Sequence, residues 1–338
     1  MRRRFARAGQ LPFVSMERPS STPAPATWRI GIVGAGRSRQ GLGPFLASAF
    51  ERAGARVAGV AGRDAASAAR AAHELAGRLG HAVPAFAGAH ELAAAVDLLV
   101  VAAPVPAHLA GLQAALAAGV PCLCEKPLVD WRDATAGQRL VAGFRERGLL
   151  LVENCQWPFV LPAFFALYPE RIGQTVHTVV MGLSPAGTGL GMVEDSLSHV
   201  LSLVQALAPL STAARVEAVT QSAPGPLAEH NVVCFRIVDG TATIVVELHL
   251  RRCPEPPRPA WFAVDGCRVD RRLGPDYTQD FVTPDGRSAF AEDPLSRLVY
   301  GLLEPLPENR RERTDASADA ISVRLGLFVA VLDALTAV

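Results

Sequence analysis

The sequence predicts an α/β protein in which a doubly wound parallel sheet is followed by a second, α+β domain with an antiparallel sheet. Two observations carry this prediction. From residue 28 to about residue 154, short apolar segments alternate with helical ones through tight connections. After residue 155 this alternation gives way to hairpin signals. The 338 residues are enough for two such domains.

The first domain is predicted over residues 28–153. Its strands are expected at 29–33, 56–61, 83–86, 97–102, 120–125 and 149–154. Its helices are expected at 44–53, 64–80, 107–118 and from 130 onward. Pro44 suits a first helical turn, Asp64 can cap the second helix with its carboxylate, and Gly119 can close the third.

The second domain is predicted over residues 154–338. Two hairpins are expected, with strands at 231–238 and 241–250 and at 261–264 and 267–269. Their two-residue turns are predicted at Asp239-Gly240 and Asp265-Gly266. A closing helix with an apolar stripe is expected at 316–337.

Two segments could be mistaken for membrane or targeting sequences. Residues 98–124 contain no charged side chain, but prolines interrupt them, and a buried strand–helix–strand unit has the same composition. Residues 1–27 contain arginines but lack the apolar region of a secretory signal. We therefore expect a disordered N-terminal extension, with Met16 as an alternative start.

Composition argues against several classes of protein. Charged residues make up 19% of the chain, and the net charge is +1. This near-equal number of basic and acidic residues gives no attraction to nucleic acid or to a membrane surface. The six cysteines form no Cys-x-x-Cys pair, and no histidine, cysteine and carboxylate cluster has metal-site spacing. We expect a cytoplasmic protein with reduced thiols, a small-molecule substrate and no bound metal.

The turn after the first strand, residues 34–39, reads G-A-G-R-S-R and predicts a dinucleotide site. Glycines allow the sharp turn and let a pyrophosphate approach the following helix. The residues expected to contact the cofactor here are Gly34, Gly36, Arg37 and Ser38. Arg39 replaces the third glycine of the usual pattern, and an ordinary glycine-rich turn is the alternative.

The end of the second strand favours NADP(H) over NAD(H) as the cofactor. NAD sites usually place Asp or Glu here for the ribose hydroxyls, whereas this chain has Gly62 and then Arg63. An arginine can pair with the 2′-phosphate of NADP. Asp64 is expected to cap the next helix, and the preference would reverse if its carboxylate turned toward the cofactor.

Lys126 is the only lysine among the 33 basic residues, and it lies in Glu125-Lys126-Pro127 at the end of the fifth strand. A lysine amine can release a proton near neutral pH, which an arginine cannot. The position therefore indicates a catalytic role. The alternative is that one lysine remains in an arginine-rich chain by chance.

Asp195 and His199 are four residues apart, so they share one face of a helix. A carboxylate beside an imidazole can raise the pKa of the imidazole and orient the ring, as in a general base. A surface ion pair without function is the alternative.

These motifs together resemble the Gfo/Idh/MocA oxidoreductases. The resemblance rests on the glycine turn, on Ala102-Ala103-Pro104 followed by His108, on Glu125-Lys126-Pro127, and on Asp195-Ser196-Leu197-Ser198-His199. It implies a Rossmann domain, a second domain with a large, mostly antiparallel open sheet, and hydride transfer at a carbon that bears a hydroxyl. Family members are commonly dimers or tetramers, so we expect a homodimer or homotetramer. Leu197 and Ser202 depart from the family pattern and leave the substrate open.

The resemblance implies that Lys126, Asp195 and His199 are catalytic. The cofactor contacts that it adds are Ala103, Pro104, His108, Glu125 and Lys126. Asn154 and Trp157 follow the sixth strand and are expected to contact the substrate, with packing at the hinge as the alternative for Trp157. Lys126 is expected to bind the reacting oxygen, while Asp195 orients His199 or holds a neighbouring hydroxyl. Either Lys126 or His199 could carry the proton.

The function favoured by the sequence is that of an NADP-dependent dehydrogenase or reductase acting on a sugar, cyclitol or similar polyol. The alternatives are a reductase of an imine or a non-sugar carbonyl in a biosynthetic pathway, and a non-catalytic NAD(P)-sensing protein. The presence of Lys126, Asp195 and His199 argues against the non-catalytic alternative.

Overall fold

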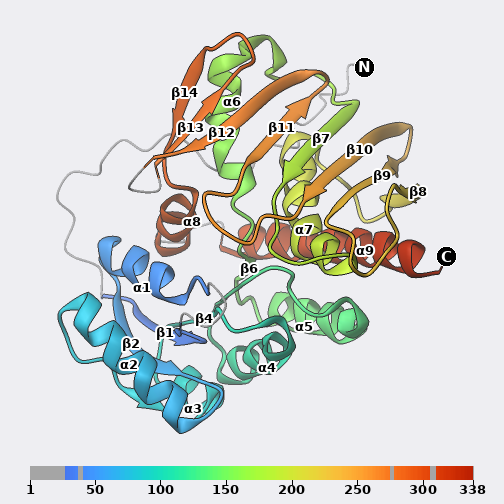
Figure 1. Ribbon diagram of the computed structural model, residues 1–338. Helices are drawn as coiled ribbons and strands as arrows, with labels where there is room; N and C mark the ends of the chain where they lie inside the picture. The colour runs from blue at the N-terminus through green and yellow to red at the C-terminus, as the bar shows by residue number, and fades with distance from the viewer. Residues whose placement is uncertain (1–26, 37–40, 275–277, 305–309, 338) are drawn as a thin grey trace, which may run out of the picture.

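Two sheets, seen one above the other in Figure 1, organise the protein. The computed structural model describes residues 27–36, 41–274, 278–304 and 310–337. The N-terminal sheet has six parallel strands in the order β3-β2-β1-β4-β5-β6, and the second sheet has eight strands, mostly antiparallel. The fold class predicted from the sequence is confirmed.

The N-terminal sheet alternates with helices along the chain. Its strands are β1 Arg29–Val33, β2 Arg56–Ala61, β3 Ala85–Phe86, β4 Leu98–Val101, β5 Cys122–Cys124 and β6 Leu151–Glu153. Its helices are α1 Gly43–Arg52, α2 Ala65–Leu79, α3 Ala89–Ala94, α4 His108–Ala118 and α5 Ala134–Glu146. Several strands are shorter than predicted, and the sequence analysis missed the six-residue helix α3.

Both faces of the N-terminal sheet are covered by helices. Ile32 and Val100 belong to the core shared with α1 and α2, whereas Leu99 and Val101 belong to the core shared with α4 and α5. This burial on both faces explains the uncharged stretch, because residues 98–124 form β4, α4 and β5 as predicted. No helix in the described part of the chain has the length and apolar character needed to cross a membrane.

The second sheet has the order β14-β13-β12-β11-β7-β10-β9-β8. Its strands are β7 Thr178–Leu183, β8 Arg215–Gln221, β9 His230–Asp239, β10 Ala242–Arg251, β11 Ala260–Val264, β12 Cys267–Leu273, β13 Gln279–Val282 and β14 Ser288–Ala291. The β11–β12 hairpin turns at Asp265 and Gly266, both at positive φ, as predicted. The β9–β10 turn lies one residue later than predicted, at Gly240-Thr241, because Asp239 pairs with Ala242.

The remaining helices are α6 Leu161–Leu167, α7 Leu190–Leu207, α8 Pro294–Leu303 and α9 Arg310–Thr336. Helix α9 runs between the two sheets, as Figure 1 shows, and begins earlier than predicted. Its Ile321 and Leu325 join the N-terminal core, while Phe328 and Leu332 join the core under the second sheet. The C-terminal helices therefore complete the N-terminal core. The predicted segments 1–27, 28–153 and 154–338 stay predictions, and residues 1–26 lie outside the described chain.

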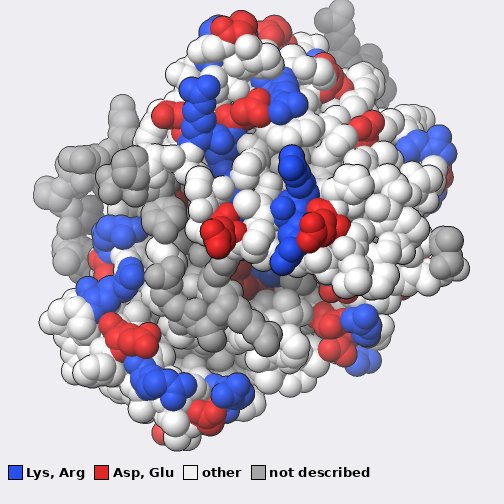
Figure 2. All heavy atoms as spheres, viewed as in Figure 1, with Lys and Arg blue, Asp and Glu red and all other residues white. Residues whose placement is uncertain are grey.

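Figure 2 shows the same face of the molecule with its charged side chains coloured. Basic and acidic side chains are intermixed over both sheets and do not gather by sign. This distribution agrees with the net charge of +1.

Candidate active site

A cleft of about 1510 Å³ lies between the carboxyl ends of the parallel strands and the second sheet. Ligands of open parallel sheets bind at this edge, where the strand order reverses. The predicted site residues that line the cleft are Gly34, Gly36, Gly62, Arg63, Ala103, Pro104, His108, Glu125, Lys126, Asn154, Trp157, Asp195 and His199. The fold thus brings together every predicted site residue that the structure describes. Arg37 and Ser38 lie outside the described residues.

The glycine turn lies directly against the end of β4. Gly34 has a φ of 86°, and a Cβ at this position would lie 2.5 Å from the Cα of Ala103. Only glycine fits both the backbone conformation and this close approach. At Gly36, which lines the cleft, no atom lies within 4 Å of the Cβ position, so its backbone is open to a ligand.

Gly43, the first residue of α1, replaces the third glycine that the sequence analysis sought at position 39. A Cβ at Gly43 would lie 2.7 Å from the Cα of Ala35 and 2.7 Å from the carbonyl oxygen of Gly34. Gly43 therefore allows the close helix–strand packing that the third glycine of a dinucleotide fold provides. The signal in the sequence was Pro44, which marks the first turn of the helix.

The end of β2 is shaped by the cap of α2. The carboxylate of Asp64 accepts a 2.7 Å hydrogen bond from the Ser67 amide, and the Ser67 hydroxyl accepts one from the Asp64 amide. These bonds lower the pKa of Asp64 and confirm its predicted capping role. A Cβ at Gly62 would lie 2.5 Å from the Ser67 hydroxyl, so packing requires this glycine. Arg63 is exposed at the edge of the cleft and pairs with Asp64 at 3.3 Å.

Two charged residues of α2 that the sequence analysis missed also line the cleft. Arg70 and Glu74 lie on the same helix face as Ser67. Their spacing of three and seven residues from Ser67 was the available signal. Arg70 places a second arginine on the wall that carries Arg63.

His108 ties the turns after β4 and β5 to each other. Its Nε2 lies 2.8 Å from the carbonyl oxygen of Ala103, and its Nδ1 lies 2.9 Å from that of Pro127. Burial lowers the pKa of His108, so the ring is neutral and donates to one carbonyl at a time. His108 therefore holds these two turns together on the cofactor side of the cleft. Both of its ring nitrogens are engaged, so neither is left for a ligand.

Lys126 reaches across the cleft to α7. Its Nζ donates to both the Oδ1 and the backbone carbonyl oxygen of Asp195, each at 2.6 Å. Burial opposes ionisation of Asp195, but the charge of Lys126 and its hydrogen bond outweigh burial and lower the pKa of Asp195. An ammonium group has three donors, so one remains for another acceptor.

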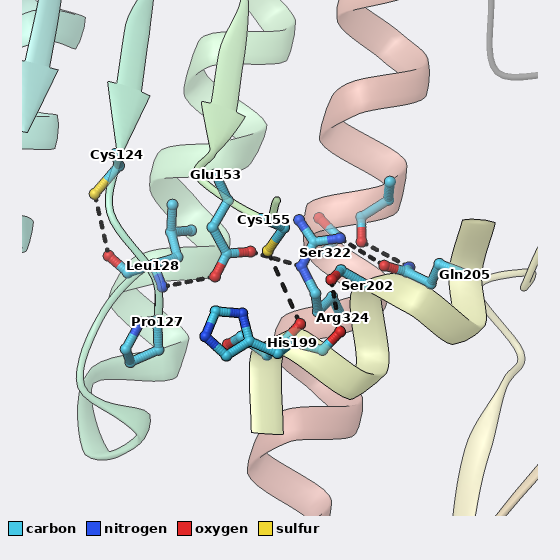
Figure 3. Close-up of polar contacts among 12 residues, drawn as sticks. Cys124, Pro127, Leu128, Glu153, Cys155, His199, Ser202, Gln205, Ser322 and Arg324 are labelled. Atoms are coloured by element: carbon cyan, nitrogen blue, oxygen red, sulfur yellow. Dashed lines mark hydrogen bonds and ion pairs between the residues drawn. The ribbon is translucent and has the colours of Figure 1, made fainter. Parts of the chain in front are cut away.

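His199 lies one helical turn after Asp195, and Figure 3 shows its imidazole extending from α7 toward the turn at Pro127. Its Nδ1 is buried and has no hydrogen-bond partner among the described residues. Burial and the charge of Lys126 lower the pKa of His199, although the charge of Asp195 acts in the opposite direction. The predicted rise in the pKa of His199 is therefore wrong. The carboxylate of Asp195 binds Lys126, not the imidazole.

Glu125 and Asn154 form a buried pair at the ends of β5 and β6. The Asn154 amide donates to the Glu125 carboxylate, and burial raises the pKa of Glu125 to about 7. The Asn154 Oδ1 accepts a hydrogen bond from Gln156 at 3.3 Å. Asn154 therefore fixes Glu125, and the half-buried Gln156 also lines the cleft.

Trp157, predicted as a substrate contact, is mostly part of the core. Only 6% of its surface is exposed, and its ring packs edge-on against Phe262 and Phe281 at centroid distances of 6.0 and 6.4 Å. It also meets His199 edge-on at 6.5 Å. Trp157 therefore packs the wall behind His199 and presents little of its ring to the cleft.

A buried ion pair that the sequence analysis missed connects the two sides of the cleft. Figure 3 shows Glu153, at the end of β6, between the turn that follows Lys126 and helix α9. Its carboxylate accepts hydrogen bonds from the Leu128 amide at 3.1 Å and from the Arg324 Nε at 2.6 Å. Arg324 also donates to Gln205 of α7 at 2.6 Å. Because these partners are more than 100 residues from Arg324, no local pattern pointed to them.

Leu197 and Ser202, the two departures from the family pattern, lie away from the cleft. Leu197 is fully buried in the core under the second sheet. The Ser202 hydroxyl is buried and donates to the carbonyl oxygen of His199 at 2.8 Å. Neither residue lines the cleft, so these departures change the packing of α7 and not the ligand surface.

The residues of the cleft fit a dinucleotide on one side and a reacting group on the other. Gly34, Gly36 and Gly43 form the close-packed turn that a pyrophosphate needs. Lys126, Asp195 and His199 then place a cation, a carboxylate and a neutral imidazole beyond it. Among the described residues, no cluster of histidine, cysteine and carboxylate side chains could hold a metal ion.

Comparison with protein families identifies the N-terminal domain. Residues 28–154 match the GFO_IDH_MocA family, described as an oxidoreductase family with an NAD-binding Rossmann fold. This match confirms the resemblance for the N-terminal domain, which carries three of the four motifs. No curated protein sequence matches the chain.

Solved structures of similar fold span nearly the whole chain. UDP-N-acetylglucosamine 3-dehydrogenase GnnA from Acidithiobacillus ferrooxidans is 23% identical, with 92% of this chain and 99% of that chain covered and a TM-score of 0.61. GenD2 from gentamicin A biosynthesis, solved with NAD, is 20% identical, with 94% and 98% covered and a TM-score of 0.65. An oxidoreductase from Pseudomonas syringae is 16% identical, with 92% and 98% covered and a TM-score of 0.65. At these identities the likeness shows the fold.

Proposed function

We propose that this chain, whose residues 28–154 match the GFO_IDH_MocA oxidoreductase family, transfers hydride between NADP(H) and a carbinol or carbonyl carbon of a sugar or similar polyol. The observation that carries the proposal is the contact between Lys126 and Asp195. It joins the turn after β5 to α7, in the same cleft as the glycine turn. A bound nicotinamide would supply or accept the hydride there.

Lys126 is proposed to hold the reacting oxygen. Two of its donors are engaged by Asp195, which directs the third into the cleft. A fixed ammonium group beside a carbinol oxygen stabilises the negative charge that develops as the proton leaves. Asp195 thus serves to position Lys126, which replaces the earlier expectation that it orients His199.

His199 is proposed to exchange the proton of the reacting hydroxyl. Its lowered pKa keeps the imidazole neutral near pH 7, and only the neutral ring can accept a proton. The neutral ring can accept the hydroxyl proton during oxidation of an alcohol, although burial and the charge of Lys126 make it a weak base. Lys126 is the alternative carrier of this proton.

NADP(H) is proposed as the cofactor because of the wall formed by α2. Arg63 and Arg70 line the cleft there, and Asp64 is committed to its helix cap. No carboxylate is thus left directly after β2 to bind the ribose hydroxyls, while two guanidinium groups are available for a 2′-phosphate.

A sugar-like substrate is proposed from the relatives of similar fold. GnnA is a dehydrogenase of UDP-N-acetylglucosamine, and GenD2 belongs to gentamicin A biosynthesis. Both names point to carbohydrate chemistry in proteins that share this fold over nearly their whole length.

The test is a titration of the purified protein with NADPH and NADH, followed by a screen of polyols and carbonyls for a change in nicotinamide absorbance. We expect tighter binding of NADPH and turnover of at least one sugar or polyol. Binding of neither cofactor would contradict the oxidoreductase function itself. Turnover confined to imines or non-sugar carbonyls would contradict the proposed substrate class.

A further inference from the structure

Arg271 is an arginine on the inner face of the second sheet. It follows the fully buried Val269 by two residues on β12, so both side chains lie on the face that packs against the helices. Arg268 and Asp270 alternate with them on the other face, where they form an ion pair at 2.8 Å. Arg271 lines the cleft from the side opposite the parallel sheet.

The charge of Arg271 is not neutralised within the described chain. Its Nη2 donates to the carbonyl oxygen of Arg258 at 3.1 Å, and its guanidinium lies 5.4 Å from the centroid of the Trp157 ring. Its Nε is buried without a hydrogen-bond partner, and no carboxylate among the described residues pairs with it. Burying a guanidinium without a counter-ion is costly, so such a group marks a place where an anion is expected.

The charge of Arg271 reaches the reacting groups of the cleft. The charge of Arg271 contributes to the lowered pKa of His199, and that of Arg258 to the lowered pKa of Asp195, so both arginines lie within electrostatic range of the reacting groups. The carboxylate of Asp195, which also lines the cleft, binds Lys126 and not Arg271. A neutral polyol would leave the charge of Arg271 uncompensated.

We propose that the substrate carries a carboxylate or phosphate group and that Arg271 binds this group. This inference rests on the proposed function and narrows its substrate class from polyols to anionic sugars. The guanidinium fork matches the two oxygens of a carboxylate or phosphate. With the anion at Arg271, the rest of the sugar would extend past Trp157 toward His199 and Lys126.

The experiment compares matched pairs of sugars on the protein saturated with NADPH, with binding measured by calorimetry. The pairs are galactose and galacturonate, glucose and glucose 6-phosphate, and N-acetylglucosamine and UDP-N-acetylglucosamine. We expect the anionic member of at least one pair to bind at least about tenfold more tightly than its neutral partner, as a charge-assisted contact provides. The pair in which the anionic sugar binds more tightly shows whether the site prefers a carboxylate, a phosphate or a diphosphate.

Two substitutions assign the effect to Arg271. R271M should abolish the preference for the anion, and R271K, which keeps the charge but loses the fork, should retain part of it. The control is R272M, because Arg272 is the exposed neighbour on the same strand and does not line the cleft. Thermal unfolding of each NADPH complex verifies that the variants fold.

Two outcomes would overturn the inference. One is that no anionic sugar binds more tightly than its neutral partner, and the other is that R271M keeps the preference. In either case, NADPH binding and turnover of a neutral sugar would leave the proposed function standing. If the unmodified protein does not bind NADPH at all, the proposed function itself is refuted.

Discussion

Lys126 makes its two described hydrogen bonds to a residue that is 69 positions away in the chain. A guanidinium in its place would keep the charge, but it would not fit two acceptors at 2.6 Å and would not release a proton near pH 7. We therefore expect K126R to lower turnover by at least about 100-fold while NADPH affinity changes little. Steady-state kinetics and cofactor titration on the same preparation check this. Turnover close to that of the unmodified protein would rule out the role given to Lys126.

Glu125 gives a pH-dependent prediction, because burial raises its pKa from 4.5 to about 7. The folded state then binds more protons than the unfolded state between these values, so the stabilisation present below pH 4.5 is lost as the pH rises through 7. E125Q removes this ionisation and can still accept the hydrogen bond from Asn154. Relative to the unmodified protein, E125Q should gain about 2 kcal/mol in free energy of unfolding between pH 5 and pH 8.

Urea unfolding of both proteins at the two pH values measures that gain. The comparison cancels the contributions of other groups, including His108 and His199, whose lowered pKa values act with the opposite sign. A constant difference between the two proteins would show that Glu125 ionises normally in the fold.

The β2–α2 connection is the element that decides cofactor choice in our proposal. Arg63 is exposed and its described ion pair is with Asp64, so it is available to a 2′-phosphate at little cost. R63A should weaken the binding of NADPH by about tenfold and the binding of NADH by much less. The matched control is R56A, because Arg56 begins the same strand at its far end and does not line the cleft. Equal losses for the two cofactors in R63A would remove the basis for the NADP proposal.

Local patterns predicted most elements, and the misses have physical causes. The alternation of strands and helices, the Asp64 cap and the β11–β12 turn depend on neighbouring residues, so the sequence alone was sufficient for them. The β9–β10 turn was misplaced by one residue because strand register depends on pairing along the whole hairpin. Helix α3 was missed because six residues are too short for a periodic signal.

At the scale of the molecule, Glu153 and Arg324 join the N-terminal sheet to α9 and, through Gln205, to α7. Removing one partner of a buried ion pair leaves the other charge unpaired, so R324M and E153Q should each lower the free energy of unfolding by about 3 kcal/mol. The double variant should lose less than the sum of the two, because both charges are then gone.

Denaturant unfolding of the single and double variants measures the coupling between these two residues. The control is R145M, which removes exposed ion pairs between α5 and α9 with Asp315 and Asp319 and should cost less than about 1 kcal/mol. Strictly additive losses in R324M and E153Q would show that the pair does not act as one connection.

The parallel sheet, the glycine turn, the capped helix and the helix face shared by Asp195 and His199 could all be predicted from the order of residues. Each of these depends on residues a few positions apart, where backbone geometry sets the spacing. Three contacts became known only from the folded chain: Asp195 binds Lys126, Gly43 packs against the glycine turn, and Arg271 faces the cleft. These contacts depend on how distant segments pack, and packing also reversed the predicted pKa shift of His199, because burial cannot be read from neighbouring residues.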